Sequence, residues 1–202
     1  MPLGSGGQVQ PAAPDRGAAG ELGALRRARL PREAVTPRPA ERSDLEGILD
    51  LLGRLNANGS AADARYRLRG HSRALLRAQI LDTWFGRFLP FPACWVLGGD
   101  GAGEAGEAGE AGGASLAGLI SGEPMQVHPV LDQPPTARID NLWIEPDHRR
   151  KGLARALVAT FRGAAHEAGY PRIEVSTLAR DAQALAFWRE MGFEDLRVVL
   201  SS

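Results

Sequence analysis

The residues best suited to chemistry lie between positions 149 and 155, where small residues and cations separate a strand from a helix. Gly152 and Ala154 keep this stretch free of bulky side chains, so backbone N–H groups can approach an anion closely. A helix N-terminus carries unpaired N–H groups and a partial positive charge, which together bind phosphate. The basic residues around the same point are Arg149, Arg150, Lys151 and Arg155. The pattern predicts a pyrophosphate-binding turn over Arg149–Ala154.

A competing interpretation is a solvated basic helix start, because most runs of charge are simply exposed. The coincidence of a strand, a small-residue turn and an amphipathic helix in one short window favours the anion site. The segment lacks a G-K-[ST] ending, so it is not a P-loop for nucleoside triphosphates. A second glycine pattern, G-x-G-x-x-G from Gly101 to Gly106, precedes no apolar helix. We interpret Gly101–Gly113 as a solvated hairpin loop.

The elements that must position the turn are a strand over Ala137–Ile144 and a helix over about Gly152–Ala168. The helix has its expected buried stripe at Leu153, Leu157, Phe161, Ala164 and Ala168. Other expected strands are Ala34–Thr36, Ala93–Leu97, Ser115–Ile120, Ile173–Thr177 and Leu196–Leu200. Other expected helices are one that opens at a Ser43–Glu46 capping box and ends at Asn58–Ser60, one over Ser72–Phe88, and one over Asp181–Met191. This order predicts an α/β domain around one mixed sheet.

The composition of the chain limits the other functions that it could have. Residues 1–33 are rich in Gly, Ala, Pro and Arg, which predicts a flexible low-complexity tail before a single domain over 34–202. Lys plus Arg and Asp plus Glu both number 24, so no net charge recruits nucleic acid or anionic membrane. Cys94 is the only cysteine and is expected to be a buried small hydrophobe. With no signal peptide and no apolar span, we expect a cytoplasmic protein, and a homodimer stays open.

Two motifs in this order resemble the GNAT superfamily of acetyl-CoA-dependent N-acetyltransferases. The R-x-x-G-x-A at Arg149, Gly152 and Ala154 is similar to the family's [QR]-x-x-G-x-[GA]. About thirty residues later, Asp181–Phe193 is similar to N-x-x-A-x-x-[FL]-Y-x-x-x-G-F. The resemblance covers about Ala34 to the C-terminus. It implies a mixed, mostly antiparallel sheet with a splayed central pair of parallel strands, flanked by about four helices.

The resemblance implies acetyl-CoA as co-substrate, direct attack of an amine on the thioester, and no metal. Backbone groups of Leu142–Ile144 are expected to pair with the pantetheine arm, and the Ile144 N–H to polarise the thioester carbonyl. The residues expected to bind the cofactor are Leu142, Trp143, Ile144, Arg149, Arg150, Lys151, Gly152, Leu153, Ala154, Arg155, Asp181, Ala184 and Phe187.

The catalytic and acceptor residues are expectations drawn from the same resemblance. Asp140 is the expected general base if the strand alternates regularly, with Glu145 and Glu123 as alternatives. Trp188 stands where the family has a tyrosine acid, and an indole N–H is far too weak an acid for that role. Asp181 replaces the usual Asn.

Acceptor choice is assigned to the segment from Asn56 to Pro92. There Tyr66, Arg67 and Trp84 are expected to bind the amine of a small molecule or peptide, and the arginines suit one that bears a carboxylate. The alternatives are a catalytically weak acyl-CoA-binding or regulatory module and, more distantly, a nucleic-acid binder that the charge balance disfavours.

Overall fold

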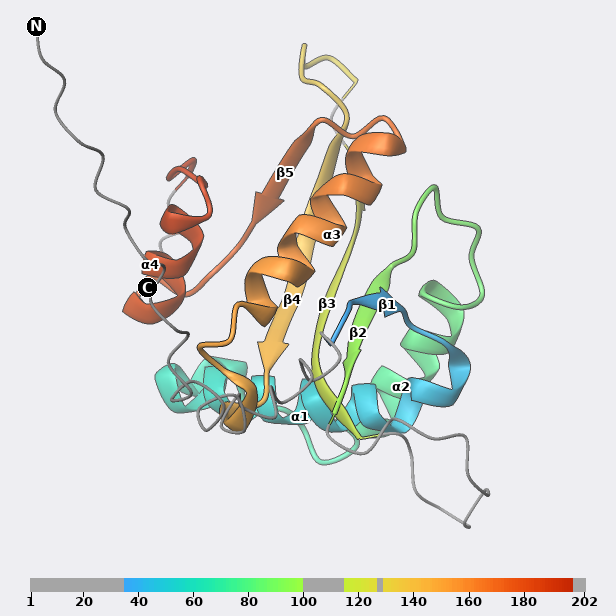
Figure 1. Cartoon of the computed structure of the whole chain (residues 1–202), viewed down its shortest axis with the longest axis vertical. Helices are drawn as coiled ribbons and strands as arrows, with labels where there is room; N and C mark the ends of the chain where they lie inside the picture. The colour runs from blue at the N-terminus through green and yellow to red at the C-terminus, as the bar shows by residue number, and fades with distance from the viewer. Residues whose placement is uncertain (1–34, 100–114, 127–128, 198–202) are drawn as a thin grey trace, which may run out of the picture. The chain divides into compact units, whose positions relative to one another are not determined.

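The computed structural model describes residues 35–99, 115–126 and 129–197. They form one five-stranded sheet in the order β1-β2-β3-β4-β5, with helices on both faces (Figure 1). The predicted tail at 1–33 and the predicted loop at Gly101–Gly113 lie outside the described residues, so both stay predictions. In the part of the chain that is described, no helix combines the length and apolarity needed to cross a membrane.

The sheet is mixed, as predicted. Its strands are β1 (Arg38–Pro39), β2 (Cys94–Gly98), β3 (Leu116–Met125), β4 (Thr136–Ile144) and β5 (Arg172–Val175). Every neighbouring pair is antiparallel except β4 and β5, which run parallel.

Two of the predicted strands differ. The first strand lies at Arg38–Pro39, where it pairs with Trp95 and Val96. Of the predicted strand Ala34–Thr36, Val35 and Thr36 are not in a strand, and Ala34 is outside the description. Of the predicted strand Leu196–Leu200, Leu196 and Arg197 are not in a strand, and residues 198–200 are outside the description.

The helices are α1 (Leu45–Ala62), α2 (Ser72–Thr83), α3 (Leu153–Glu167) and α4 (Ala182–Glu190). Single 3-10 turns lie at Arg42–Asp44, Ala64–Tyr66 and Pro146–His148. The helix α1 continues through Gly59, contrary to the predicted stop, because glycine in a helix interior costs only about 1 kcal/mol. The helix α2 ends before the predicted Phe88, since the N–H groups of Trp84 and Phe85 both donate to the Ile80 carbonyl and close it.

The predicted capping box of α1 is wrong. The carboxylate of Asp44, rather than Glu46, accepts from a backbone N–H at this entry, that of Glu41 at 2.8 Å. Glu46 instead forms ion pairs with Arg73 and Arg77 of α2. Ser43 and Glu46 have the spacing of a capping box, but the Glu46 carboxylate pairs with the arginines of α2 and not with a backbone N–H.

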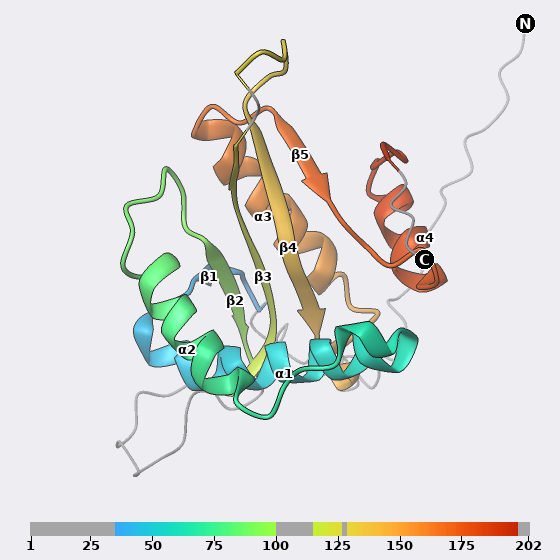
Figure 2. The same cartoon turned by 180° about the vertical axis from the view of Figure 1, so that it is seen from behind.

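The sheet separates two apolar clusters. On one face, α3 and α4 cover residues that include Phe91, Trp95 and Ile139 (Figure 1). On the other face, α1 and α2 cover Cys94, Val96 and Leu119 among others (Figure 2). The predicted α3 stripe is confirmed at its centre, where Leu157 and Phe161 are fully buried, together with Val158 and Ala165. The prediction for Cys94 is also confirmed, and burial raises the pKa of its thiol.

An ion pair between the half-exposed Arg38 and the buried Asp44 anchors β1 to the start of α1. Arg38 donates two hydrogen bonds of 2.7 Å to the Asp44 carboxylate, which is 1% exposed. Burial acts to raise the pKa of Asp44, but the guanidinium and the Glu41 N–H outweigh it and lower that pKa overall. The pair therefore stabilises the fold at neutral pH, and its contribution is lost as the pH falls through the lowered pKa of Asp44.

Arg38→Met is expected to lower the free energy of unfolding by about 2 kcal/mol at pH 7, because it leaves a buried carboxylate without its charged donor. The loss should shrink toward pH 3, where Asp44 is protonated in the unfolded chain and increasingly so in the variant. Urea unfolding at several pH values measures both effects. A loss that stays constant with pH would contradict the ionic origin.

Candidate active site

A gap opens in the sheet where β5 leaves β4. Their register runs from Thr136 opposite Arg172 to Ile139 opposite Val175 and ends there. The strand β4 continues to Ile144, paired only with β3, while the chain after β5 turns away toward α4 (Figure 1). The second half of β4 thus has one open edge. The strands β4 and β5 therefore form the splayed parallel pair that the family resemblance implies.

A bulge marks the point where the gap begins. Opposite β3, Ser121 pairs with Asn141 and Gly122 with Ile139, so Asp140 is an extra residue on β4. The bulge reverses the alternation: Ala137 and Ile139 contact the α3 face before it, and Leu142 and Ile144 contact that face after it. The regular alternation assumed for Asp140 therefore does not occur, although its catalytic role stays untested.

The open edge of β4 presents backbone groups at every second residue. The N–H of Glu145 donates to the Ala117 carbonyl at 2.8 Å, so residues 145 and 143 face β3 in this antiparallel ladder. Leu142 and Ile144 must then direct their N–H and C=O groups away from β3, into the gap. A chain of amides laid along this edge could exchange hydrogen bonds with them as a further strand does.

The predicted turn follows at the end of β4. Gly152 has φ +80° and caps α3, and Arg150 before it is also left-handed at φ +62°. The first backbone bond of α3 runs from Ala156 N–H to the Gly152 carbonyl, so the N–H groups of Leu153, Ala154 and Arg155 precede the helical ladder. A Cβ at Gly152 would meet nothing within 4 Å, so the space beside the first residue of the turn into α3 is open.

The basic side chains of the turn have different environments. Arg149 donates to the Ile144 carbonyl at 2.9 Å, and Lys151 donates to the Asp147 carbonyl at 2.8 Å. Arg155 forms an ion pair with Glu190 of α4. Of the four, only Arg150 has no polar partner within the described residues. The spacing of the motif placed these cations together, but it carried no information on which of them stays unpaired.

Carboxylates near the gap are held by arginines that sequence reasoning did not select. Arg138 donates to Asp140 at 2.5 Å and lies 3.4 Å from Glu123. The hydrogen bond to Asp140 is the main cause that raises the pKa of Arg138. Glu145 forms an ion pair with Arg54 of α1. Arg54 lies ninety-one positions from Glu145, and Arg138 lies two positions from Asp140. Neither separation in the sequence indicates an ion pair.

The second motif forms α4 as predicted. Asp181 caps the helix by accepting from the Ala184 N–H at 2.9 Å. Trp188 is 7% exposed and packs edge-on against Phe187 and Phe193, with ring centroids 5.1 and 5.2 Å away. This residue is therefore part of the α3-side core as well as of the motif.

The segment expected to choose the acceptor, Asn56–Pro92, runs from the last turns of α1 through α2 to the residues before β2. Arg65 pairs with Asp63 at 2.6 Å, a bond that is the main cause lowering the pKa of Asp63 to about 2. The charge of Arg180, between β5 and α4, also lowers the pKa of Asp63. Arg67 and Arg69 are exposed, and no ion pair within the described residues involves them.

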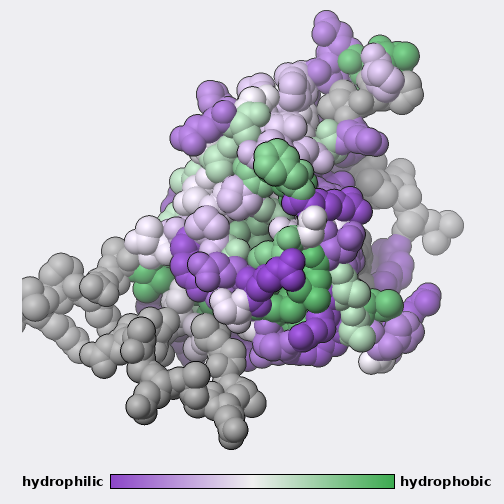
Figure 3. Space-filling view, turned by 90° about the vertical axis from the view of Figure 1, so that its right-hand side faces the viewer, coloured by the Kyte–Doolittle hydropathy of each residue, from purple (hydrophilic) through white to green (hydrophobic). Residues whose placement is uncertain are grey.

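Trp84, also in the predicted acceptor set, packs against the α1 and α2 cluster. Arg73, in the same segment, pairs with Glu46 and Asp50. Phe88 and Leu75 are among the exposed apolar side chains of this segment. Figure 3 shows apolar and hydrophilic side chains interspersed on one face of the molecule. On α2, Leu75 is 59% exposed, whereas Ile80 is buried.

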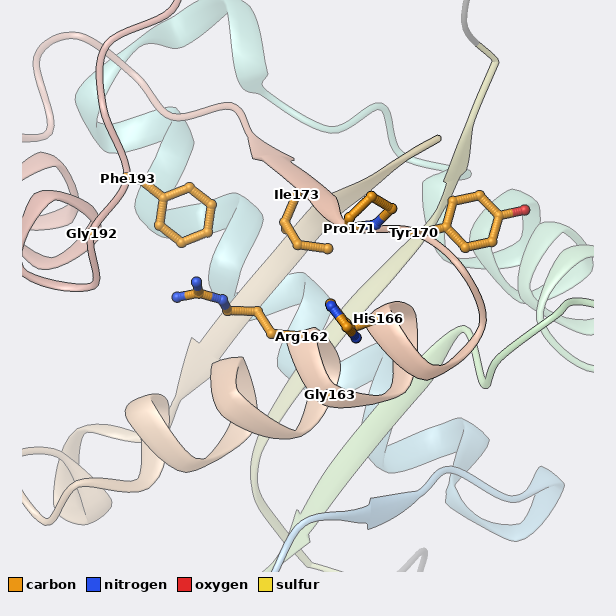
Figure 4. A pocket seen from close by; sticks show the side chains of 8 residues that line it. All are labelled: Arg162, Gly163, His166, Tyr170, Pro171, Ile173, Gly192 and Phe193. Carbon is orange, nitrogen blue, oxygen red and sulfur yellow. The ribbon is translucent and has the colours of Figure 1, made fainter. Parts of the chain in front are cut away.

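A separate cavity of about 350 Å³ lies at the other end of α3. Arg162 and His166 project from the helix toward Pro171 and Ile173 (Figure 4). The lining is completed by Gly163, Tyr170, Gly192 and Phe193. This cavity contains none of the predicted site residues.

Comparison with known proteins agrees with this geometry. The sequence model of the acetyltransferase (GNAT) family matches residues 82–193, which include both motifs. The chain is 35% identical over 54 residues to N-acetyltransferase 8 of Homo sapiens. That match covers 27% of this chain and spans about a quarter (24%) of the length of the human protein.

Solved structures share the fold. The aminoglycoside N-acetyltransferase AAC(6')-Iy, solved with CoA and with the bisubstrate analogue CoA-S-monomethyl-acetylneamine, is 16% identical in the latter complex, with a TM-score of 0.57. The similarity covers 82% of this chain and 95% of that one. The aminoglycoside antibiotic 6'-N-acetyltransferase AAC(6')-IG of Acinetobacter haemolyticus is 14% identical, with a TM-score of 0.57 over 83% and 96% of the two chains.

Proposed function

Because this chain belongs to the GNAT acetyltransferase family, we propose that it is an N-acetyltransferase that moves an acetyl group from acetyl-CoA to the amine of a small molecule or peptide. The observation that carries the proposal is the continuity of two binding surfaces. The open edge of β4 at Leu142 and Ile144 leads directly to the unpaired N–H groups at the start of α3.

Acetyl-CoA fits these surfaces in one orientation. Its pyrophosphate accepts from the N–H groups of Leu153, Ala154 and Arg155, and Arg150, which has no polar partner in the described ranges, adds a positive charge. Its pantetheine amides pair with the open backbone of β4, which brings the thioester to the gap near the bulge. The turn suits an anion, since three N–H groups at the start of α3 precede its helical ladder and the space beside Gly152 is open.

The transfer itself needs three groups. A neutral amine attacks the thioester carbonyl, and the Ile144 N–H stabilises the oxyanion that develops. Asp140, or alternatively Glu123 or Glu145, accepts the proton that the amine loses. Collapse of the intermediate forms the amide and releases CoA thiolate, which water can protonate because a free thiol titrates near 8.5.

The test is a thiol-release assay with acetyl-CoA and a panel of amines, combined with calorimetric titration of CoA. Binding in the micromolar range and release of CoA thiol that depends on both the acceptor and the protein support the proposal. Absence of CoA binding at millimolar concentration overturns it. Mass spectrometry of the acceptor, which must gain one acetyl group, separates transfer from hydrolysis of the thioester.

The second candidate is an acyl-CoA-binding or regulatory module with weak catalysis. Trp188 favours it, because a buried indole stands where the resemblance places an acidic hydroxyl. The assay separates the two functions: CoA binding with no acceptor turnover over the whole panel supports the module and contradicts the enzyme.

We further propose that the acceptor bears a carboxylate near its amine, recognised by Arg67 and Arg69. Their neighbours Arg65 and Arg73 are already paired with carboxylates of the chain, which leaves these two cations available. Charge-assisted hydrogen bonds at exposed positions contribute about 0.5–1 kcal/mol each.

Replacing both Arg67 and Arg69 with glutamine is therefore expected to raise KM for such an acceptor about fivefold to tenfold. The KM for the same acceptor with its carboxylate amidated should not change. Steady-state kinetics measure this, and Arg73→Gln, at a paired position, is the matched control. An equal rise for both forms of the acceptor would contradict recognition of the carboxylate.

A further inference from the structure

The first arginine of the turn points back to the sheet. Its Nε donates to the Ile144 carbonyl at 2.9 Å, and its guanidinium carbon lies 4.7 Å from the ring centroid of Trp143. The Trp143 ring in turn packs against the α1 and α2 cluster. Arg149 is therefore held between the last two residues of β4, while its neighbour Arg150 has no polar partner within the described residues.

The hydrogen bond from Arg149 pairs a carbonyl that the gap leaves without a partner strand. The Ile144 carbonyl belongs to the open edge of β4, because Glu145 N–H already bonds to Ala117 of β3 and the pairing with β5 ended at Ile139. A strand end with one free edge can rotate its peptide planes. The Arg149 hydrogen bond fixes the Ile144–Glu145 peptide, and stacking on Trp143 fixes the guanidinium.

We propose that Arg149 is a positioning residue, whose side chain holds the end of β4 in the geometry for transfer and does not neutralise phosphate. The inference deepens the proposed acetyl transfer and rests on it. The hydrogen bond from Arg149 fixes the peptide that follows Ile144. It thereby restrains the preceding peptide, whose N–H is that of Ile144 and faces the thioester carbonyl. Phosphate binding at the turn is left to the backbone and to Arg150.

The test compares two acetyl donors, acetyl-CoA and S-acetylpantetheine, which lacks the phosphates. Arg149→Leu is expected to lower kcat about tenfold with both donors and to change the Kd for CoA less than threefold. Arg150→Leu, the matched variant, should instead lose more with acetyl-CoA than with S-acetylpantetheine. A phosphate-binding Arg149 predicts the opposite result: a raised Kd for CoA and a loss confined to acetyl-CoA.

Arg149→Gln provides the rescue. A glutamine amide can donate to the Ile144 carbonyl but carries no charge, so kcat should recover to within about threefold of the unchanged chain. Loss with glutamine equal to that with leucine would overturn the proposal, and thermal melts of all variants check that the fold is retained.

A readout independent of turnover separates this inference from the proposed function. Hydrogen exchange at the Glu145 N–H, which bonds to Ala117, should quicken about tenfold in Arg149→Leu and return in Arg149→Gln. If no amine is acetylated by the unchanged chain, the proposed function fails while this measurement still decides the positioning contact. Unaltered exchange in Arg149→Leu would overturn it.

Discussion

Gly152→Asp is expected to weaken CoA binding about 100-fold. The new carboxylate would lie at the start of α3, in the open space where the pyrophosphate is expected, and two like charges about 4 Å apart repel by several kcal/mol at the dielectric of a protein surface. The fold should tolerate the change. Asp is among the few residues other than glycine that adopt the left-handed conformation found at φ +80°, so the cost in stability should be small.

Gly152→Asn is the matched control, because it has the same shape and the same tolerance of the left-handed conformation but no charge. Its affinity for CoA should fall less than tenfold, by steric contact alone. Calorimetric titration measures both variants, and a thermal melt should show Asp at least as stable as Asn, since an anion at a helix N-terminus is stabilising. Equal affinities for the two variants would contradict a phosphate site at this turn.

The turn was predictable because all of its signals are local. A strand, a glycine, an alanine and an amphipathic helix follow one another within about twenty residues, and φ +80° at Gly152 is the conformation that glycine alone adopts freely. The order of strands and helices was predictable for the same reason. The splayed pair was expected from the family resemblance, and β4 and β5 do separate after Ile139.

The chemistry around the gap depends on contacts that local pattern does not contain. The bulge at Asp140 arises from the register of β4 against β3, and it changes which side chains share a face. The pairing of Glu145 with Arg54 joins residues that are 91 positions apart. The Arg149 side chain points back to β4 because it donates to the Ile144 carbonyl, which has no partner strand after β5 diverges. The sequence thus predicted the backbone of the turn and the order of the elements better than the contacts that hold the side chains around the gap.

The predicted oxyanion donor is a backbone group, so it is tested by a backbone change. Replacing the amide before Ile144 with an ester, by incorporating the α-hydroxy acid that corresponds to isoleucine, deletes one N–H and keeps the side chain in the core. We expect kcat to fall about 100-fold to 1,000-fold, the usual effect of losing one oxyanion donor. The Kd for CoA should rise less than about threefold, because Leu142 and the turn retain their donors.

The matched control is the same ester placed before Leu119 of β3. Leu119 lies opposite Trp143, and by alternation from Glu145 its N–H bonds within the ladder and not toward the gap. That ester should lower the free energy of unfolding by about 1–2 kcal/mol, the effect of one lost backbone hydrogen bond, and should lower kcat only slightly. The Ile144 ester should show the reverse, because its N–H has no partner in β3. If the two esters lower kcat equally, the rate depends on the stability of the sheet, and the Ile144 N–H is not the group that stabilises the transition state.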